Sequence, residues 1–389
     1  MKRLQVLFLA ALSSSLLLFG CGKKDAETTS NPVIEMQPQT QPSTQDADPG
    51  QDVEKETEAE DTETPPAEGM VRSRLTNEWV DEEIAKMRPI AVMVPNTKTA
   101  SQYGLSDASV LYECNVEGSM TRLMAIWEDW SNLEKIGNIR SCRDYYLYWA
   151  FEWDAIYIHF GGPFYIDPLV NREDTQNINC ISYSGAAYRT TAKNSTDNAF
   201  TSTSNIKDAI DHYGYPTEYR EGYADEHHYL YAPSSEPNTL DQYSDAITAS
   251  KVDMSPAYPV TNCYFIYNES TGLYDRYQHL SGDSDGPHID LANNKQLAFK
   301  NILVQSTYYE TRDDKGYLAF QCHDNTRDGW FFTNGKGIHV TWEKTSDYGA
   351  TRYYDDDGNE IRLNTGKTMV CILEEGDSFN VDDKAIESK

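Results

Sequence analysis

The chain has 389 residues, a formal net charge of −29 at pH 7, and 27 tyrosines. A negative field of this size excludes nucleic acid and other anionic polymers as broad surface partners. Residues 71–389 are too many for one ordinary core, so we expect two domains. The tyrosines suit half-buried pleated sheet, although stacking against carbohydrate would use the same side chain.

The N-terminus has the pattern of a secretory signal. Lys2 and Arg3 precede a single apolar run, and small residues lead into Cys21. The ending Leu18-Phe19-Gly20-Cys21 resembles a bacterial lipobox, in which the cysteine receives a diacylglyceryl group after cleavage. We expect residues 1–20 to be a lipoprotein signal peptide and Cys21 to be lipidated; an uncleaved anchor is the alternative. Either outcome places the remainder outside the cytoplasm.

Residues 21–70 are predicted to form a disordered acidic tether. Thr, Gln, Pro, Asp and Glu dominate, so the segment cannot bury enough apolar surface to offset the entropy of ordering. Thirteen acidic residues against three lysines between Lys23 and Glu68 extend it further by self-repulsion. We expect this tether to hold the folded part away from the outer face of the cytoplasmic membrane.

Residues 71–235 are predicted to form an α/β domain. The apolar run 89–94 indicates a buried strand. The alternating runs 109–117 and 120–127 indicate two strands of a hairpin.

The hairpin would bring opposite charges together if its loop had two residues. Asn115 would then face Arg122, and the arginine would lie diagonal to both Glu113 and Glu117. A different loop length would break this pairing, because a slip of one residue exchanges the two faces.

A capped helix is predicted to follow. Ser141 as N-cap and Asp144 at the third helical position fit a variant of the capping box, and the aromatic run 145–151 continues the helix. Arg140 and Arg143 then flank a helix N-terminus, where the macrodipole already favours negative charge. Two guanidiniums there need an anionic partner. That partner is either a ligand or an acid of the same fold, namely Glu113, Glu117 or Asp154.

The segment 154–160 is predicted to be a strand that ends at a glycine turn. Tyr157 and His159 share one face, and Gly161 and Gly162 permit a tight turn or the close approach of a ligand. Ligands of α/β sheets sit beyond the carboxyl ends of strands, where His159 would lie. A structural role for this histidine is the alternative.

Several segments together resemble a known family. They are RPIAVMV-x-N from Arg88, GLSDAS-x-LYE, VEGSMTRLMAI, EKIGNIRSCRDYYLYWAFEWDAIYIHFGG, YDRYQH, GIHVTWEK and YYDDDGNEIRLNTGKTMVCIL. In this order they resemble the YerB-like bacterial lipoproteins, which carry paired regions called domain of unknown function 3048. The likeness covers nearly everything from Arg88 to Leu373.

The resemblance implies a lipid-anchored envelope protein with an α/β first domain and a β-rich second one, but no assigned activity. By motif, the family's polar positions fall on Asn96, Glu113, Glu117, Arg122, Arg140, Ser141, Arg143, Asp154, His159, Gly161 and Gly162. The sequence departs from the family at Pro95, where an acid is usual, and at Asp197, where a histidine is common. A mechanism that needs either group is doubtful here.

Residues 250–380 are predicted to form a β-rich, mainly antiparallel domain, because short strand-like runs alternate with turn signals such as Asn334-Gly335. The acidic run 355–360 suits calcium, but it lacks the register of a calcium loop and a hairpin turn explains it better. His288 and Asp290 have no nearby residues that would complete a metal set. We therefore expect no metal and no cofactor.

The remaining cysteines show no zinc spacing. They are Cys114, Cys142, Cys180, Cys263, Cys322 and Cys371. We interpret them mainly as small buried residues, with a disulfide between Cys114 and Cys142 left open because the compartment permits oxidation.

The chain contains no nucleophile elbow, phosphate-binding loop or dinucleotide fingerprint. The leading hypothesis is a non-enzymatic binding or assembly protein with an arginine-rich anion pocket. Its partners would be the membrane, through Cys21, and an anionic envelope ligand or an envelope protein. The candidate site is Glu113, Glu117, Arg122, Arg140, Ser141, Arg143, His159, Gly161 and Gly162.

The first alternative is an enzyme acting on a phosphorylated or acidic envelope glycan or lipid intermediate. In that enzyme the arginines would hold phosphate, and His159 or Glu117 would move a proton. A solute-binding lipoprotein is the second alternative, disfavoured because the second domain does not look like another α/β lobe.

Overall fold

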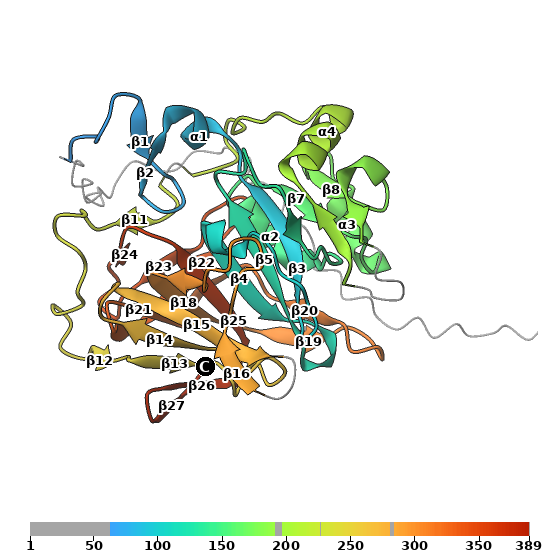
Figure 1. Ribbon diagram of the computed structural model, residues 1–389. Coiled ribbons are helices and arrows are strands. Elements are labelled where there is room, and N and C mark those ends of the chain that lie inside the picture. Colours follow the sequence, from blue (N-terminus) through green and yellow to red (C-terminus); the bar gives the residue numbers. More distant parts are fainter. Residues whose placement is uncertain (1–62, 191–196, 226, 281–283, 389) are drawn as a thin grey trace, which may run out of the picture. The chain divides into compact units, whose positions relative to one another are not determined.

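The computed structural model describes residues 63–190, 197–225, 227–280 and 284–388 (Figure 1). The predicted signal peptide, Cys21 and the tether as far as residue 62 lie outside the described residues. The tether was expected to reach residue 70, but Glu63 already contacts the fold, where its Oε1 accepts a hydrogen bond from Ser235 N at 2.7 Å. Within the described part, no helix is long and apolar enough to cross a membrane.

A mixed sheet of eleven strands forms the centre of the fold. In spatial order its strands are β12 (Ile247–Thr248), β22 (Lys336–Lys344), β21 (Asp324–Thr333), β18 (Asn301–Thr307), β25 (Thr368–Glu374), β4 (Val110–Asn115), β5 (Thr121–Trp127), β3 (Ile90–Asn96), β7 (Ile156–His159) and β8 (Asn177–Asn179), with β23 (Arg352–Tyr354) beside β22. Every residue of β3 is buried, as expected for an unbroken apolar run in a strand covered on both faces.

A second sheet of seven antiparallel strands packs against one face of the first (Figure 1). Its strands are β13 (Lys251–Asp253), β14 (Tyr264–Asn268), β15 (Leu273–Leu280), β16 (Ser284–Pro287), β17 (Ala298–Phe299), β26 (Ser378–Val381) and β27 (Lys384–Glu387). Phe265 and Phe379 of this sheet share one apolar core with Leu123 and Ile302 of the larger one.

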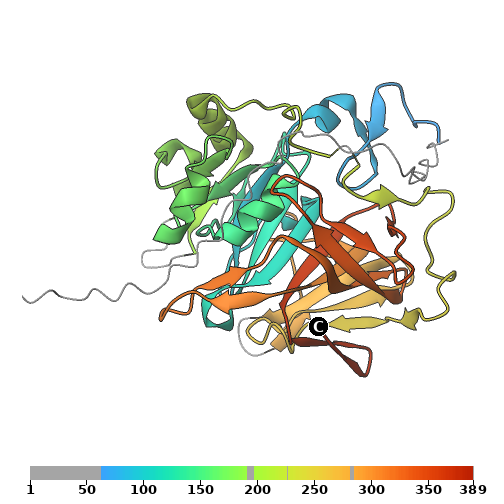
Figure 2. The same ribbon diagram turned by 180° about the vertical axis from the view of Figure 1, so that it is seen from behind.

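The opposite face of the large sheet is covered by α2 (Asp144–Phe151), which lies in front of it when the molecule is seen from behind (Figure 2). Six of its eight residues are buried, so this helix is apolar nearly all round. The aromatic run predicted to be a core-facing helix is confirmed. Tyr145 and Tyr146 meet the Trp149 ring edge to face, and Trp149 stacks on Tyr112 of β4.

The other helices and strands lie outside these two sheets. They are β1 (Met70–Arg72), β2 (Trp79–Asp81), α1 (Glu82–Lys86), β6 (Ile136–Gly137), α3 (Asp167–Val170), β9 (Tyr188–Arg189), β10 (Ala199–Thr201), α4 (Thr203–Tyr213), β11 (Leu230–Tyr231), β19 (Tyr309–Thr311), β20 (Leu318–Phe320) and β24 (Arg362–Leu363). In α4, the Ser202 hydroxyl caps the first turn and Gly214, at φ 68°, ends the helix in the left-handed region.

The predicted fold class is confirmed: an α+β first part precedes a β-rich, mainly antiparallel second part. The expected boundary near residues 235–250 marks a change along the chain but no division in space. The described residues of both parts fall in one compact unit, in which β4 of the first part pairs in parallel with β25 of the second. Both apolar cores also draw residues from both parts.

The predicted hairpin of β4 and β5 forms, but its register differs from the expected one. Asn115 pairs with Thr121, and Cys114 pairs with Arg122. The loop is longer than two residues and turns through Gly118 at φ 73° and Ser119 at φ 56°. The predicted pairing of Asn115 with Arg122 is therefore wrong, and the arginine lies on the opposite face of the sheet from Glu113.

The predicted capping box is also wrong. Helix α2 begins at Asp144 with Arg143 in the N-cap position and without a side-chain cap. Ser141 cannot cap it, because the preceding segment stays extended against β3, with Arg140 N donating to Met93 O at 2.8 Å. The Asp144 carboxylate instead forms an ion pair with Arg312.

The acidic run 355–360 forms the predicted turn. Asp355 Oδ1 accepts hydrogen bonds from Asp357 N at 3.1 Å and Asn359 N at 2.8 Å. The six cysteines of the described part are free and buried, as their interpretation as small core residues predicts, and no Cys114–Cys142 disulfide forms.

Candidate functional site

Arg122 and Arg143 converge on Glu117 beside the start of α2. Arg143 forms a two-point ion pair, with its Nε donating to Glu117 Oε2 at 3.0 Å and its Nη2 contacting Oε1. Arg122 Nη2 lies 3.8 Å from the same Oε1, and its Nη1 donates to the carbonyl oxygen of Ser141. Ser141 thus contributes its backbone to the cluster.

Burial opposes the charge on each member of this cluster. For Glu117, the hydrogen bonds and charge of Arg143 outweigh burial and lower the pKa of the carboxyl. For Arg122, burial and then the positive charge of Arg143 lower the pKa of the guanidinium. Glu117 therefore compensates mainly the charge of Arg143, and the charge of Arg122 is less well compensated.

Arg140 has a different partner. Its Nε lies 3.3 Å from Oδ1 of Asp197. Asp154, another predicted partner of the arginines, instead pairs with Arg88 and Arg220. Of the three acids proposed to compensate Arg140 and Arg143, only Glu117 does so.

His159 is enclosed, with 1% of its surface exposed. Its Nδ1–H donates to the Gly161 carbonyl at 2.8 Å, and its Nε2 lies 3.0 Å from Oδ1 of Asn177. Burial lowers the pKa of the imidazole. These hydrogen bonds do not involve Arg122, Arg140 or Arg143. The imidazole therefore stabilises the glycine turn and is not part of the arginine cluster.

The two glycines make that turn compact. Gly161 adopts φ 67°, and its carbonyl also accepts a hydrogen bond from Cys142 N at 2.8 Å. A Cβ added to Gly162 would come within 2.2 Å of Cδ1 of Ile166. Both glycines therefore serve the close packing of the turn against the segment before α2.

Glu113 belongs to a second polar cluster on the opposite face of the sheet. Its Oε1 accepts hydrogen bonds from Asn96 Nδ2 at 2.7 Å and from Thr121 Oγ1 at 2.6 Å. Its Oε2 forms an ion pair with Arg276 Nη2 at 2.7 Å, and neither side chain is exposed.

The guanidinium of Arg276 continues this network toward the surface. Its Nη1 donates to Gln278 Oε1 at 2.9 Å and to Nδ1 of His288, whose Nε2–H contacts Gln102 Oε1. Burial, and then the charge of Arg276, lower the pKa of His288 well below its ordinary value. A neutral imidazole with its proton on Nε2 satisfies both contacts.

The sequence analysis singled out His288 but missed Arg276. A signal existed, because Tyr274, Arg276 and Gln278 alternate along one strand and so share a face. A charged residue on the buried face of a strand requires a buried partner. Periodicity alone does not say that the partner is Glu113, which lies far away in the sequence.

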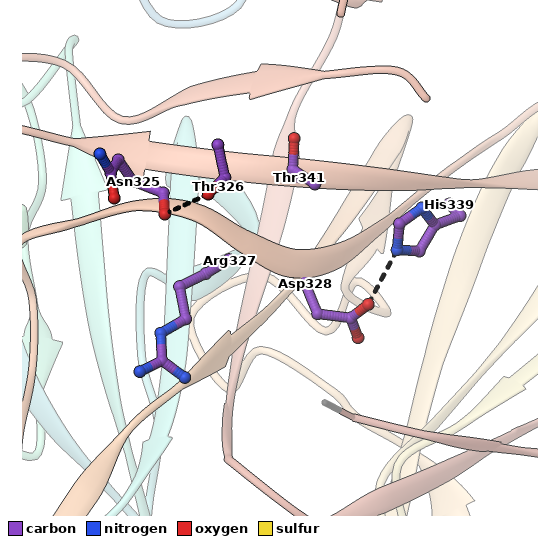
Figure 3. Close-up of a pocket in the computed structure, with 6 residues that line it drawn as sticks. All are labelled: Asn325, Thr326, Arg327, Asp328, His339 and Thr341. Atoms are coloured by element: carbon purple, nitrogen blue, oxygen red, sulfur yellow. Dashed lines mark hydrogen bonds and ion pairs between the residues drawn. The ribbon is translucent and has the colours of Figure 1, made fainter. Parts of the chain in front are cut away.

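A separate surface cavity of about 380 Å³ lies over β21 and β22 (Figure 3). His339 contacts Asp328 through Nε2 at 2.8 Å and Asp356 through Nδ1 at 2.5 Å. The hydrogen bond to Asp328, only partly opposed by burial, and the bond to Asp356 raise the pKa of His339 to about 9. The histidine is therefore a cation at neutral pH whose charge is compensated by the protein.

The protein is a strand-rich α+β protein. Its two sequence segments together build the large sheet, and a polar cluster lies on each face of that sheet. Residues 75–216 match the model of the N-terminal domain of DUF3048, described as a protein of unknown function, and residues 252–370 match the C-terminal domain. The chain belongs to this family, as its motifs predict.

Two comparisons agree with that assignment. The chain is 24% identical over 320 residues to a Bacillus subtilis protein named "Putative lipoprotein YerB", covering 80% of this chain and 88% of the relative. It also shares its fold with the crystal structure of YerB from Bacillus subtilis. The TM-score is 0.65 at 22% identity, over 78% of this chain and 96% of the other.

The buried pair of Glu113 and Arg276 generates a stability prediction. We expect Glu113→Gln to lower the free energy of unfolding by about 3–5 kcal/mol, because it leaves the Arg276 guanidinium buried without a counter-charge. Urea unfolding measures this change. The double variant Glu113→Gln/Arg276→Met should recover part of the loss.

The exposed pair of Glu82 and Lys86, whose charged atoms are 2.6 Å apart, provides the control. Glu82→Gln should leave the stability nearly unchanged. Equal effects of Glu113→Gln and Glu82→Gln would contradict a structural role for the buried pair.

His339 generates a prediction about pH. Its folded-state pKa of about 9 exceeds its ordinary value, so its stabilising contribution is complete below about pH 6.5 and is lost as the pH rises through 9. The stability difference between the wild type and His339→Gln should therefore shrink between pH 6 and pH 10. Denaturant unfolding across this range measures it; a difference independent of pH would show that His339 does not titrate as described.

Proposed function

We propose that the protein is a lipid-anchored, extracytoplasmic envelope protein that binds an anionic envelope component without catalysing a reaction. The anchor is supported by the lipobox-like ending at Cys21 and by the likeness to a protein named as a lipoprotein. The binding role rests on the charge balance of the arginine cluster.

The charge balance of the cluster carries the proposal. Arg122, Arg140 and Arg143 are paired with two carboxylates, those of Glu117 and Asp197, which leaves one positive charge in excess. Arg122 holds this excess, because Glu117 is closer to Arg143. In a chain with a net charge of −29, a guanidinium that shares its carboxylate with a closer arginine supports an anionic ligand such as a phosphorylated or carboxylated envelope component.

The enzymatic alternative receives less support from the same residues. Glu117 is committed to its two-point pair with Arg143, and His159 is enclosed with hydrogen-bond partners at both ring nitrogens. A general base must reach the proton that it removes, and neither group is placed to do so.

The anchor is tested by Cys21→Ser. We expect the wild type to fractionate with membranes and to yield an N-terminal peptide that carries a diacylglyceryl cysteine in mass spectrometry. The variant should lose this modification, and Cys180→Ser, which removes a buried thiol elsewhere, should keep it. Unmodified wild-type protein would overturn the lipidation, and an intact residue 1 in that protein would identify an uncleaved anchor.

The binding role is tested by Arg122→Gln, with inorganic phosphate as the probe in calorimetric titrations. Loss of a charge-assisted hydrogen bond should weaken phosphate binding roughly tenfold or more. Arg122 also donates to the Ser141 carbonyl, so Tm should fall, but by less than in Arg143→Gln. Arg143→Gln should lower Tm more, because it removes the principal partner of Glu117.

Arg352→Gln, on β23, removes the same charge outside the cluster and serves as the control. If Arg122→Gln lowers Tm as much as Arg143→Gln and phosphate does not bind to the wild type, the cluster is an internal ion-pair network and the proposal fails.

A further inference from the structure

A second cavity, of about 230 Å³, lies at the outer end of the network that begins at Glu113 and Arg276. Residues 97–102 of the first sequence segment and residues 278–291 of the second contribute to it. In both segments these residues lie next to the network. Its lining is formed by Thr97, Lys98, Ala100, Gln102, Gln278, His279, Pro287, His288, Ile289 and Leu291.

The charge of this lining differs from that of the chain. The protein contains 62 acidic and 33 basic residues, yet none of the ten lining residues is acidic. Lys98 is among them, and the fully buried Arg276 stands behind Gln278 and His288. The two lining histidines add little to this charge, because His288 is held neutral by its surroundings and His279 already contacts the Asp285 carboxylate at 2.9 Å. A cavity of this composition favours an anion and provides no carboxylate that would hold an ammonium group.

Two polar groups of the lining have capacity for a ligand. Thr97 Oγ1 is buried and has no hydrogen-bond partner within the described part of the chain. Gln278 is 6% exposed, and its Oε1 is taken by Arg276, which orients the amide so that its Nε2 remains a donor without a partner among the described residues. Buried polar groups normally find partners, so the Thr97 hydroxyl indicates a missing one, and the Gln278 amide adds an oriented donor to the same lining.

The rest of the lining is apolar. Ala100, Pro287, Ile289 and Leu291 supply aliphatic surface, and the cavity has the volume of roughly eight water molecules at ~30 Å³ each. A bare inorganic anion would leave this aliphatic surface without a partner. A short aliphatic chain that carries one anionic group would use both halves of the cavity.

We propose that this cavity is a binding site for a small aliphatic carboxylate. The carboxylate accepts hydrogen bonds from Gln278 Nε2 and Thr97 Oγ1 beside the Lys98 ammonium, and the aliphatic part packs on Ile289 and Leu291. Zwitterionic amino acids are excluded by the absence of an acid in the lining. This site does not include the Arg122 cluster, so it goes beyond the anion-binding role proposed above.

The network behind the cavity positions the site. Glu113 holds Arg276, and Arg276 holds both Gln278 Oε1 and His288, so the donor of Gln278 is directed by contacts that are complete before a ligand arrives. Such preorganisation reduces the entropy lost on binding. Changing Gln278 or Arg276 would also disturb the buried network that positions the site. Thr97 is therefore the better residue to change in a test.

The test is a titration of the full chain with hexanoate, followed by calorimetry and by the shift of Tm. Hexanoate fits the volume and charge of the cavity, hexanamide matches its size without the charge, and leucine adds an ammonium group. We expect saturable binding of hexanoate, and binding of hexanamide and leucine weaker by roughly tenfold or more.

Thr97→Val keeps the size of the side chain and removes the hydroxyl, so it should weaken hexanoate binding by several-fold and leave Tm without ligand unchanged. Arg122→Gln should bind hexanoate as the wild type does, which separates this site from the arginine cluster. The proposal is overturned if hexanoate and hexanamide bind equally, if Thr97→Val binds hexanoate normally, if hexanoate fails to bind, or if inorganic phosphate displaces hexanoate and binds more tightly.

Discussion

The ion pair between Glu113 and Arg276 is the interaction on which the rest of the arrangement depends. Glu113 lies on the large sheet and Arg276 on the smaller one, and both are removed from water between the two sheets. Each charge is tolerable only in the presence of the other. Because the partners come from different sequence segments, correct docking of the two sheets is required to satisfy either residue.

This requirement links packing to specificity. The apolar core between the sheets is rich in aliphatic and aromatic residues that tolerate alternative packing, whereas a buried guanidinium with three defined contacts does not. The pair therefore selects one relative placement of the sheets. The cavity lined by Gln278 and His288 inherits its geometry from that placement.

Residue periodicity predicts much of the local structure. The unbroken apolar run of β3, the alternation of β4 and β5, and the aromatic run of α2 each match an element of the fold. Periodicity does not predict which strands lie side by side in the sheet, because nothing in the pattern of β4 identifies β25 as its partner. We expected two separate domains because residue periodicity does not reveal which distant strands pair.

The candidate site shows the same division. A guanidinium at a helix start is expected to need an anionic partner, either a ligand or an acid of the fold, and for Arg143 Glu117 is such an acid. The grouping of Arg122 with Glu113 depends on a hairpin loop length that composition does not determine, and in the structure Glu117 joins Gly118 and Ser119 in the loop. A shift of one residue in the register decides whether Arg122 and Glu113 lie in one cluster or in two clusters on opposite faces of the sheet.

The parallel pairing of β4 with β25 has a consequence for how the chain acquires its structure. Residue 110 meets residue 368 in the register, so the centre of the large sheet cannot close until nearly all of the chain is available. Such non-local closure is slow, because the entropy of the long intervening loop is lost before the contacts form. For a chain that we propose is exported, this delay keeps the early segment from completing a stable sheet while synthesis continues. The early segment thus lacks the neighbour that its central strand requires until the last strands have been made.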